Sequence, residues 1–170
     1  MSLKDQLQKL KQAYVEAGLD NAKQLQPPVS TKLLRQAEKQ MGQKLPADLR
    51  ELYLIHGGQR YVPPGSTGVF GTYRFVPVTI MVRDYLKFKE RLKKEKASKF
   101  PPKSGQKGSF HPSLIPFAGW NTSDLCIDGS GRIWEFEPER GLSETVRYPS
   151  MTALIKDLLS KVKAGKKAKL

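Results

Sequence analysis

Residues 114–137 read LIPFAGWNTSDLCIDGSGRIWEFE and contain both tryptophans and the single cysteine of the chain. Short apolar runs separated by Gly, Asn, Asp and Ser are typical of β-strands joined by tight turns. The pattern predicts strands at 114–118, 123–127 and 132–137, with the sequence DGSG at 128–131 as the turn of a hairpin. This block is therefore expected to form the sheet of the fold.

Helices are expected on both sides of this block. Apolar residues at helical spacing predict five of them, over 3–17, 30–41, 46–57, 79–97 and 150–163. A further strand is expected near 68–75. We expect one domain over 1–160, in which 1–26 form an N-terminal helical part and 98–113 a flexible basic loop, followed by a basic tail at 161–170.

The composition is that of a globular protein with an excess of basic residues. The chain has 170 residues, 38% of them hydrophobic, and a net charge of +14. Residues 83–107 carry ten Lys or Arg against three Asp or Glu, whereas residues 120–150 carry three against six. No run approaches the roughly 20 apolar residues of a membrane span, and one cysteine forms no internal disulfide. We therefore expect a cytoplasmic protein without a membrane contact.

No catalytic or metal-binding motif stands out. Asp124, Cys126, Asp128 and Glu135 match part of a calcium loop, but a thiol is a poor calcium ligand and the flanks alternate like strands. His56 and His111 have no nucleophile or second ligand near them in sequence. An enzyme would need one of them to meet the acids of 120–137 in space. We expect no cofactor, no metal and no enzymatic activity.

Two sets of residues are candidates for binding. Trp120 and Trp134 are candidate anchors for a protein partner because exposed tryptophans dominate many interfaces, although a core position is favoured for both. The expected partner-binding residues are Trp120, Asn121, Asp124, Asp128, Glu135, Glu137 and Tyr61. An acidic strip is expected along Asp124, Asp128, Glu135, Glu137 and Glu139. The expected basic patch consists of Lys87, Lys89, Arg91, Lys93, Lys94 and Lys96.

The order of these features resembles that of the SUKH superfamily, which includes the fungal SMI/KNR-type cell-wall-assembly regulators and many bacterial proteins. The resemblance covers about residues 30–160 and rests on LPADLRELYLIHGG at 45–58 and PFAGWNTSDLCIDGSGRIWEFEPE at 116–139. It implies an α+β fold with a curved, mostly antiparallel or mixed sheet packed by the N-terminal and C-terminal helices. By the same resemblance Leu45, Pro46, Gly57 and Gly58 would be structural, while Trp120, Asp124 and Trp134 would shape the sheet and its exposed face.

The resemblance also implies a function without catalysis. Many bacterial members are immunity proteins that bind and block a toxin encoded beside them, and the fungal members are regulatory scaffolds. Immunity proteins against nucleases are commonly acidic, so a chain of net charge +14 departs from that pattern. Either the toxin is acidic, or the acidic strip makes the contact alone, or the function differs.

The expected function is that of a cytoplasmic immunity protein that occludes a cognate toxin. The alternatives are a regulatory scaffold of the cell-wall-regulator type and a basic protein associated with nucleic acid through the patch on 87–96. If six basic residues contacted phosphates, affinity for duplex DNA would fall with salt at a log–log slope of about −5. The sequence leaves the oligomeric state open.

Overall fold

The computed structural model describes residues 1–60, 67–94, 100 and 109–165. Its helices and strands follow one another in the order α1 (Leu3–Glu16), α2 (Thr31–Met41), α3 (Ala47–Ile55), β1 (Arg74–Phe75), α4 (Val78–Lys94), β2 (Ile115–Trp120), β3 (Ser123–Ile127), β4 (Ile133–Glu137), β5 (Gly141–Leu142) and α5 (Met151–Lys163).

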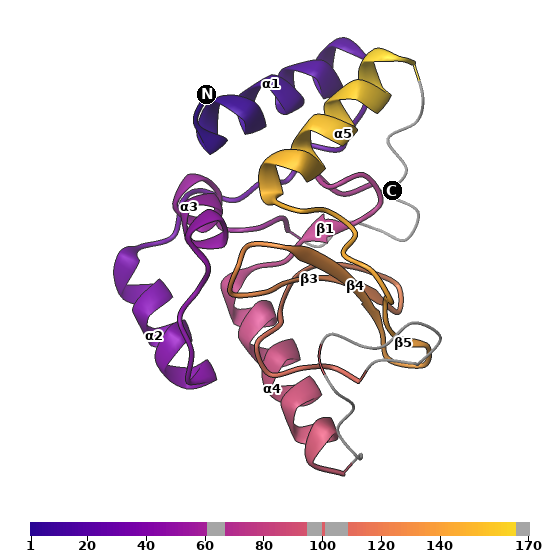
Figure 1. Ribbon diagram of the computed structural model, residues 1–170. Coiled ribbons are helices and arrows are strands. Elements are labelled where there is room, and N and C mark those ends of the chain that lie inside the picture. Colours follow the sequence, from indigo (N-terminus) through magenta and orange to yellow (C-terminus); the bar gives the residue numbers. More distant parts are fainter. Residues whose placement is uncertain (61–66, 95–99, 101–108, 166–170) are drawn as a thin grey trace.

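The strands form one sheet in the chain order β1-β2-β3-β4-β5, and each neighbouring pair is antiparallel (Figure 1). Antiparallel neighbours need only short connections, which the turn residues of 114–137 supply for β2 to β4. A bulge between Pro116 and Ala118 shifts the register of β2 against β3, and bulges of this kind bend a strand. The predicted α+β fold is confirmed, with a sheet that is antiparallel rather than mixed throughout the described residues.

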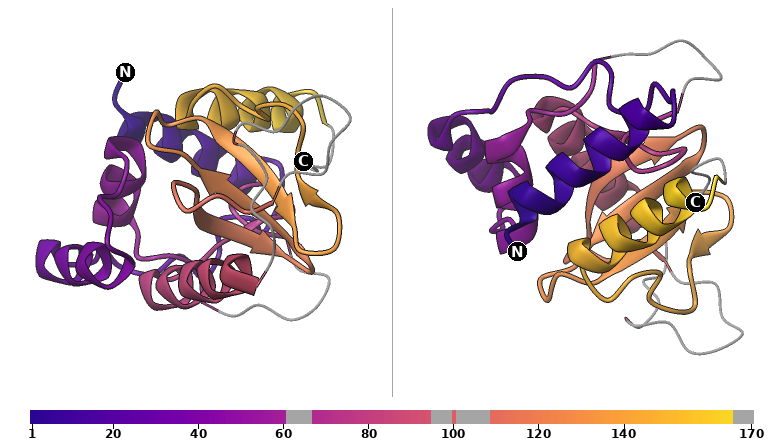
Figure 2. Two further views of the ribbon diagram at one scale, coloured as in Figure 1. Left: turned by 60° about the horizontal axis from the view of Figure 1, so that its bottom comes forward. Right: turned by 90° about the horizontal axis from the view of Figure 1, so that it is seen from above.

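Helices cover both faces of the sheet. The N-terminal helix α1 and the C-terminal helix α5 lie side by side over one face, and α4 covers the opposite face (Figure 2). Leu7 and Leu10 of α1 and Leu154 and Leu158 of α5 are almost completely buried. Each such side chain contributes roughly 1.5–3 kcal/mol through removal from water. The predicted packing by the terminal helices is confirmed, and α4 adds a second helical layer.

The helices begin close to their predicted positions because serine caps them. Ser2 and Asp5 form a capping box at α1, and the Oγ atoms of Ser30 and Ser150 accept main-chain hydrogen bonds at the starts of α2 and α5. Pro46 has a non-helical ψ of 146° and is the N-cap of α3, so that helix begins at Ala47, one residue later than predicted.

The strand predicted near 68–75 is much shorter in the structure. The amide of Gly68 donates to Gly71 O at 2.9 Å, and Phe70 and Tyr73 exchange two main-chain hydrogen bonds of 3.1 Å. A Cβ atom on Gly68 would lie 1.9 Å from Tyr73 O, so this tight turn requires glycine. Only the last two residues, Arg74–Phe75, remain to pair with β2.

Two buried amides hold this turn in place and were not expected from the sequence. The side chain of Gln59, which is 1% exposed, donates hydrogen bonds to the main-chain carbonyls of Asn21 and Lys23. It accepts hydrogen bonds from the main-chain amides of Val69 and Phe75. Asn21, also 1% exposed, donates to Gly68 O and Gly71 O. Both residues lie outside the regular elements, where a polar residue ordinarily predicts solvent exposure.

Other differences concern the chain ends and the basic loop. The short strand β5 was not predicted, and the end of the helix predicted to reach 97 lies outside the described residues. Residues 98–99 and 101–108 of the predicted loop and residues 166–170 of the predicted tail also lie outside the described residues. Residues 161–163 of the predicted tail belong to α5. Phe100 stacks on His111 with 4.7 Å between ring centroids and contacts Trp134 at 5.2 Å.

Candidate protein-binding surface

Strand register assigns the predicted acidic residues to opposite faces of the sheet. Asp124 is opposite Phe136 and Cys126 is opposite Trp134, so these side chains share one face. That face lies against α4, because the rings of Phe136 and Phe88 are 5.0 Å apart. Glu135 lies between Trp134 and Phe136 in β4, and successive residues of a strand point to opposite faces, so Glu135 lies on the other face. The acidic residues do not form the continuous strip that the sequence predicted.

Asp128 is buried and organises the hairpin between β3 and β4. Only 3% exposed, its carboxylate accepts four hydrogen bonds, from Ser130 N, Arg132 N, Arg132 Nε and Trp134 Nε1, at 2.8–3.0 Å. Burial by itself would raise the pKa of Asp128, but the hydrogen bonds outweigh it and hold that pKa below 3.8. These four hydrogen bonds stabilise the turn and fix the position of the Trp134 indole.

Glu135 belongs to a second network, on the face opposite α4. Its carboxylate accepts hydrogen bonds from Tyr73 Oη, from Ser123 Oγ at 3.1 Å and from Arg147 Nη1 at 2.6 Å. Burial, followed by the bond to Glu135, raises the pKa of Tyr73 to about 12. The network joins the chain before β1, strand β3 and the segment before α5. Glu137 instead pairs with Arg140 at 3.4 Å in the turn between β4 and β5.

Asp124 lies beneath α4 and is half-buried. Burial raises the pKa of its carboxyl to about 7, the nearby Asp84 raises it further, and Lys87 partly opposes both effects. Gly119 lies opposite on β2, where a Cβ atom would come within 2.9 Å of Asp124 Oδ1. The glycine therefore makes room for the carboxyl group of Asp124.

Trp120 and Asn121 form the exposed tip of the β2–β3 hairpin. Trp120 pairs with Ser123, which leaves a two-residue turn in which Asn121 has φ 51°. Asparagine tolerates this left-handed conformation better than most residues. The indole of Trp120 is 45% exposed, whereas Trp134 is 3% exposed. The core position favoured for both tryptophans holds for Trp134 and was wrong for Trp120.

The predicted basic patch lies on α4, with Lys87, Arg91 and Lys94 along one side of the helix and Lys89 and Lys93 about half a turn away. Its described members are exposed or half-buried: Lys87, Lys89, Arg91, Lys93 and Lys94. Lys93 pairs with Glu90 at 2.8 Å, and Lys89 Nζ lies 5.7 Å from the centroid of the Tyr85 ring. The remaining predicted residues, Lys96 of this patch and Tyr61 of the partner-binding set, lie outside the described residues.

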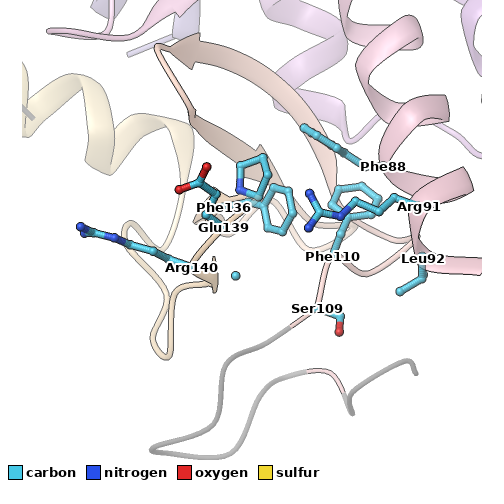
Figure 3. Close-up of a pocket in the computed structure, with 10 residues that line it drawn as sticks. Phe88, Arg91, Leu92, Ser109, Phe110, Phe136, Glu139 and Arg140 are labelled. Atoms are coloured by element: carbon cyan, nitrogen blue, oxygen red, sulfur yellow. The ribbon is translucent and has the colours of Figure 1, made fainter. Parts of the chain in front are cut away.

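Two hairpin turns and the end of α4 meet at one end of the sheet. Because β2 and β4 run in the same direction, the turn after Trp120 and the turn after Glu137 lie at the same end, about 10 Å apart at ordinary strand spacing. The ring of Phe88, on α4, packs against Phe136 near this end of the sheet. Arg91 and Leu92 of α4 line a cleft together with Glu139 and Arg140 (Figure 3). We call this region the turn-end surface. Its cleft lies on the α4 side and is lined by Arg91, Leu92, Glu139 and Arg140. Trp120 and Asn121 form the neighbouring hairpin tip, where Trp120 pairs with Ser123 and points to the face opposite α4.

The histidines do not meet the acidic residues of the sheet. His56 Nδ1 is 3.2 Å from Gln26 O and its Nε2 is 3.1 Å from Lys11 Nζ, and burial followed by Lys11 lowers the pKa of His56. His111 Nδ1 is 2.7 Å from Ser113 Oγ. Neither ring bonds a carboxylate in the described structure. Within the same residues, no group of three or more His, Cys, Asp or Glu side chains is arranged to hold a metal ion.

Comparison with known families identifies the fold. The model of the SMI1 / KNR4 family (SUKH-1) matches residues 28–157. The chain belongs to this family. The matched range includes the whole sheet, α4 and the turn-end surface, and α1 precedes it. No curated protein matches the sequence. Membership in SUKH-1 supports a non-catalytic immunity or regulatory module. In the described parts of the chain, each helix is too short or too polar to cross a bilayer.

Proposed function

We propose that this protein is a non-enzymatic, cytoplasmic protein-binding module that acts as an immunity protein and neutralises a cognate toxin by covering its active site. Membership of the SUKH-1 family supports the non-catalytic class. The exposed side chain of Trp120 at a hairpin tip is the observation on which we base the position of the binding surface. The net charge of +14 favours a toxin with an acidic face.

The hairpin is suited to this role because its shape is formed before binding. Strand pairing from Ile115 to Ile127 fixes the main chain on both sides of Trp120, so little main-chain entropy is lost when a partner docks. Tryptophan anchors at the centre of an interface commonly contribute 2 kcal/mol or more. The lysines and arginines of α4 would attract an acidic partner and raise the association rate.

The first test is capture of the partner followed by an affinity measurement. The tagged protein is exposed to nuclease-treated host lysate at roughly 300 mM salt, which screens surface charge, and the partner is identified by mass spectrometry. We expect Trp120→Ala to weaken the purified complex by about 30-fold or more, since that is the fold-change equivalent to about 2 kcal/mol. Leu54→Ala, on α3 and also exposed at 38%, is the matched control and is expected to bind normally.

The functional readout separates an immunity protein from a scaffold. An immunity protein is expected to abolish the activity of the captured toxin at equimolar ratio, and Trp120→Ala to restore that activity. A captured protein whose activity is unchanged by saturating binding would instead support a regulatory scaffold. Equal affinity of Trp120→Ala and Leu54→Ala would remove Trp120 from the interface.

A second candidate function is association with nucleic acid. It is favoured by the basic residues of α4, of which Lys87, Arg91 and Lys94 lie in one row along the helix, while Lys89 and Lys93 lie about half a turn away and Lys93 pairs with Glu90. If all five contact phosphates, the affinity for duplex DNA should fall with salt at a log–log slope of about −4 to −5. Replacing Lys87, Arg91 and Lys94 together by Gln should reduce the slope by about 3. A flat salt response in fluorescence anisotropy would exclude this function.

A further inference from the structure

The cleft on the turn-end surface has an aromatic floor. The rings of Phe88, Phe110 and Phe136 contact one another with centroids 5.0–5.5 Å apart, in tilted or edge-on arrangements. These side chains come from α4, from the chain before β2 and from β4, and all are at least 93% buried. They line the cleft together with Leu92 and Pro138 (Figure 3). Apolar ligand groups are the natural occupants of such a floor.

The size of the cleft limits what it accepts. Its volume is about 220 Å³. A closed apolar cavity of about 150 Å³ accommodates a benzene ring, whereas pockets for drug-sized ligands and cofactors span about 300–1,000 Å³. The cleft therefore matches one aromatic side chain with an adjoining polar group, and it is too small for a nucleotide.

The rim of the cleft carries charges from two elements. Arg91 reaches over the phenylalanine floor from α4, and Arg140 lies on the opposite side, in the turn between β4 and β5 (Figure 3). Glu139 is the acidic member of the rim, and Arg140 also pairs with Glu137 at 3.4 Å. Lys93 and Lys94 continue the positive charge beyond Arg91. A guanidinium both stacks on an aromatic ring and pairs with a carboxylate.

We propose that this cleft receives an aromatic side chain of the partner protein, carried on an acidic segment whose carboxylate pairs with Arg91. The inference rests on the proposed protein-binding function and names the chemistry of its partner. The ring would cover the phenylalanine floor, and the basic end of α4 would attract the flanking acidic residues. Trp120, at the neighbouring hairpin tip and directed to the opposite face of the sheet, would contact the same partner across the edge of the two turns.

Three small probes test the chemistry of the cleft without the partner. The full-length protein is titrated with 3-phenylpropionate, 3-phenylpropylamine and butyrate, and amide shifts are followed by NMR. We expect 3-phenylpropionate to bind with a Kd of about 1–10 mM, since a ligand of this size gains about 0.3 kcal/mol or more per atom. The shifts should centre on Ser109, Phe110 and Gly141. The amine and butyrate should bind at least about 10-fold more weakly, since each lacks one of the two groups.

A matched pair of variants connects the cleft to the partner. Arg91→Gln is expected to weaken both 3-phenylpropionate and the captured partner by about 10-fold, the loss of one charge-assisted hydrogen bond. Lys87→Gln, one turn earlier on α4, should leave 3-phenylpropionate binding unchanged. Equal binding of the acid and the amine, or shifts away from the cleft, would overturn the inference.

The two proposals fail in different ways. Normal partner affinity of Arg91→Gln together with lost affinity of Trp120→Ala would overturn the cleft inference and leave the proposed function standing. Capture of no toxin would overturn the proposed function, and the probe titration would then decide the ligand class of the cleft by itself.

Discussion

Replacing Asp124 by Asn is expected to stabilise the folded protein at about pH 8, by at most about 4 kcal/mol. The carboxyl has a pKa of about 7 in the fold, against 3.8 when unperturbed, because it is half-buried beneath α4 and lies near Asp84. Between these two values the folded state binds more protons than the unfolded state, so wild-type stability falls as pH rises from about 4 to about 7. Asparagine keeps the shape of the side chain and has no charge to bury.

Urea unfolding of both proteins at about pH 5 and about pH 8 measures this effect. The advantage of Asp124→Asn should be much larger at the higher pH, and the wild type should lose stability between the two conditions. Asp20→Asn is the matched control, because Asp20 is 71% exposed and pairs only with Lys23 among its described neighbours. Parallel pH profiles for the wild type and Asp124→Asn would contradict the assignment of a buried, destabilising carboxylate.

Replacing Asp128 by Ala is expected to destabilise the protein by about 3 kcal/mol. The substitution removes the acceptor of four hydrogen bonds and leaves the buried indole N–H of Trp134 without a partner. Asparagine should not rescue the fold, because its amide nitrogen would face the two donors Arg132 Nε and Trp134 Nε1. Thermal and urea unfolding measure the loss, with Glu139→Ala on the next turn as the control for removing an acidic residue. A loss below about 1 kcal/mol would mean that the turn folds without this carboxylate.

The two aspartates act on stability with opposite signs of pH dependence. The pKa of Asp128 is lowered below 3.8, so its contribution is present above about pH 4 and is lost as the pH falls through the lowered value. Asp124 penalises the fold as the pH rises toward 7. We therefore expect these two groups together to favour maximum stability at about pH 4.

Local signals in the sequence account for most of the secondary structure. Alternating apolar residues at 123–127 and 133–137, separated by DGSG, specify a hairpin without reference to the rest of the chain. Ser2, Ser30 and Ser150 mark helix starts because a serine hydroxyl supplies an acceptor to the free amides of the first turn. The short strand β5 has no such signal, since its two residues are extended only because they pair with β4.

The candidate site was predicted only in part. Trp120, Asn121 and the basic residues of α4 lie at the surface, but Asp128 and Glu135 are engaged in hydrogen-bond networks inside the protein. The cleft was not foreseen, because Phe88, Phe110 and Phe136 come from three separate segments and each looks like a core residue in isolation. The burial of Gln59 could not be predicted for the same reason, because its four hydrogen-bond partners lie between 10 and 38 residues away in the sequence.

The sequence by itself determined the helices, the strands from β2 to β4 with their turns, and the family, because these depend on residue patterns within short stretches of chain. The tertiary structure alone decided that Trp134 is buried while Trp120 is exposed, and that Asp124 lies beneath a helix. The environments of Trp134 and Asp124 depend on α4, which covers their face of the sheet, whereas Trp120 pairs with Ser123 and points to the other face. The place where α4 crosses the sheet follows from packing among residues far apart in the chain. Local periodicity shows that a strand has two faces, and only the packed neighbours determine which face water reaches.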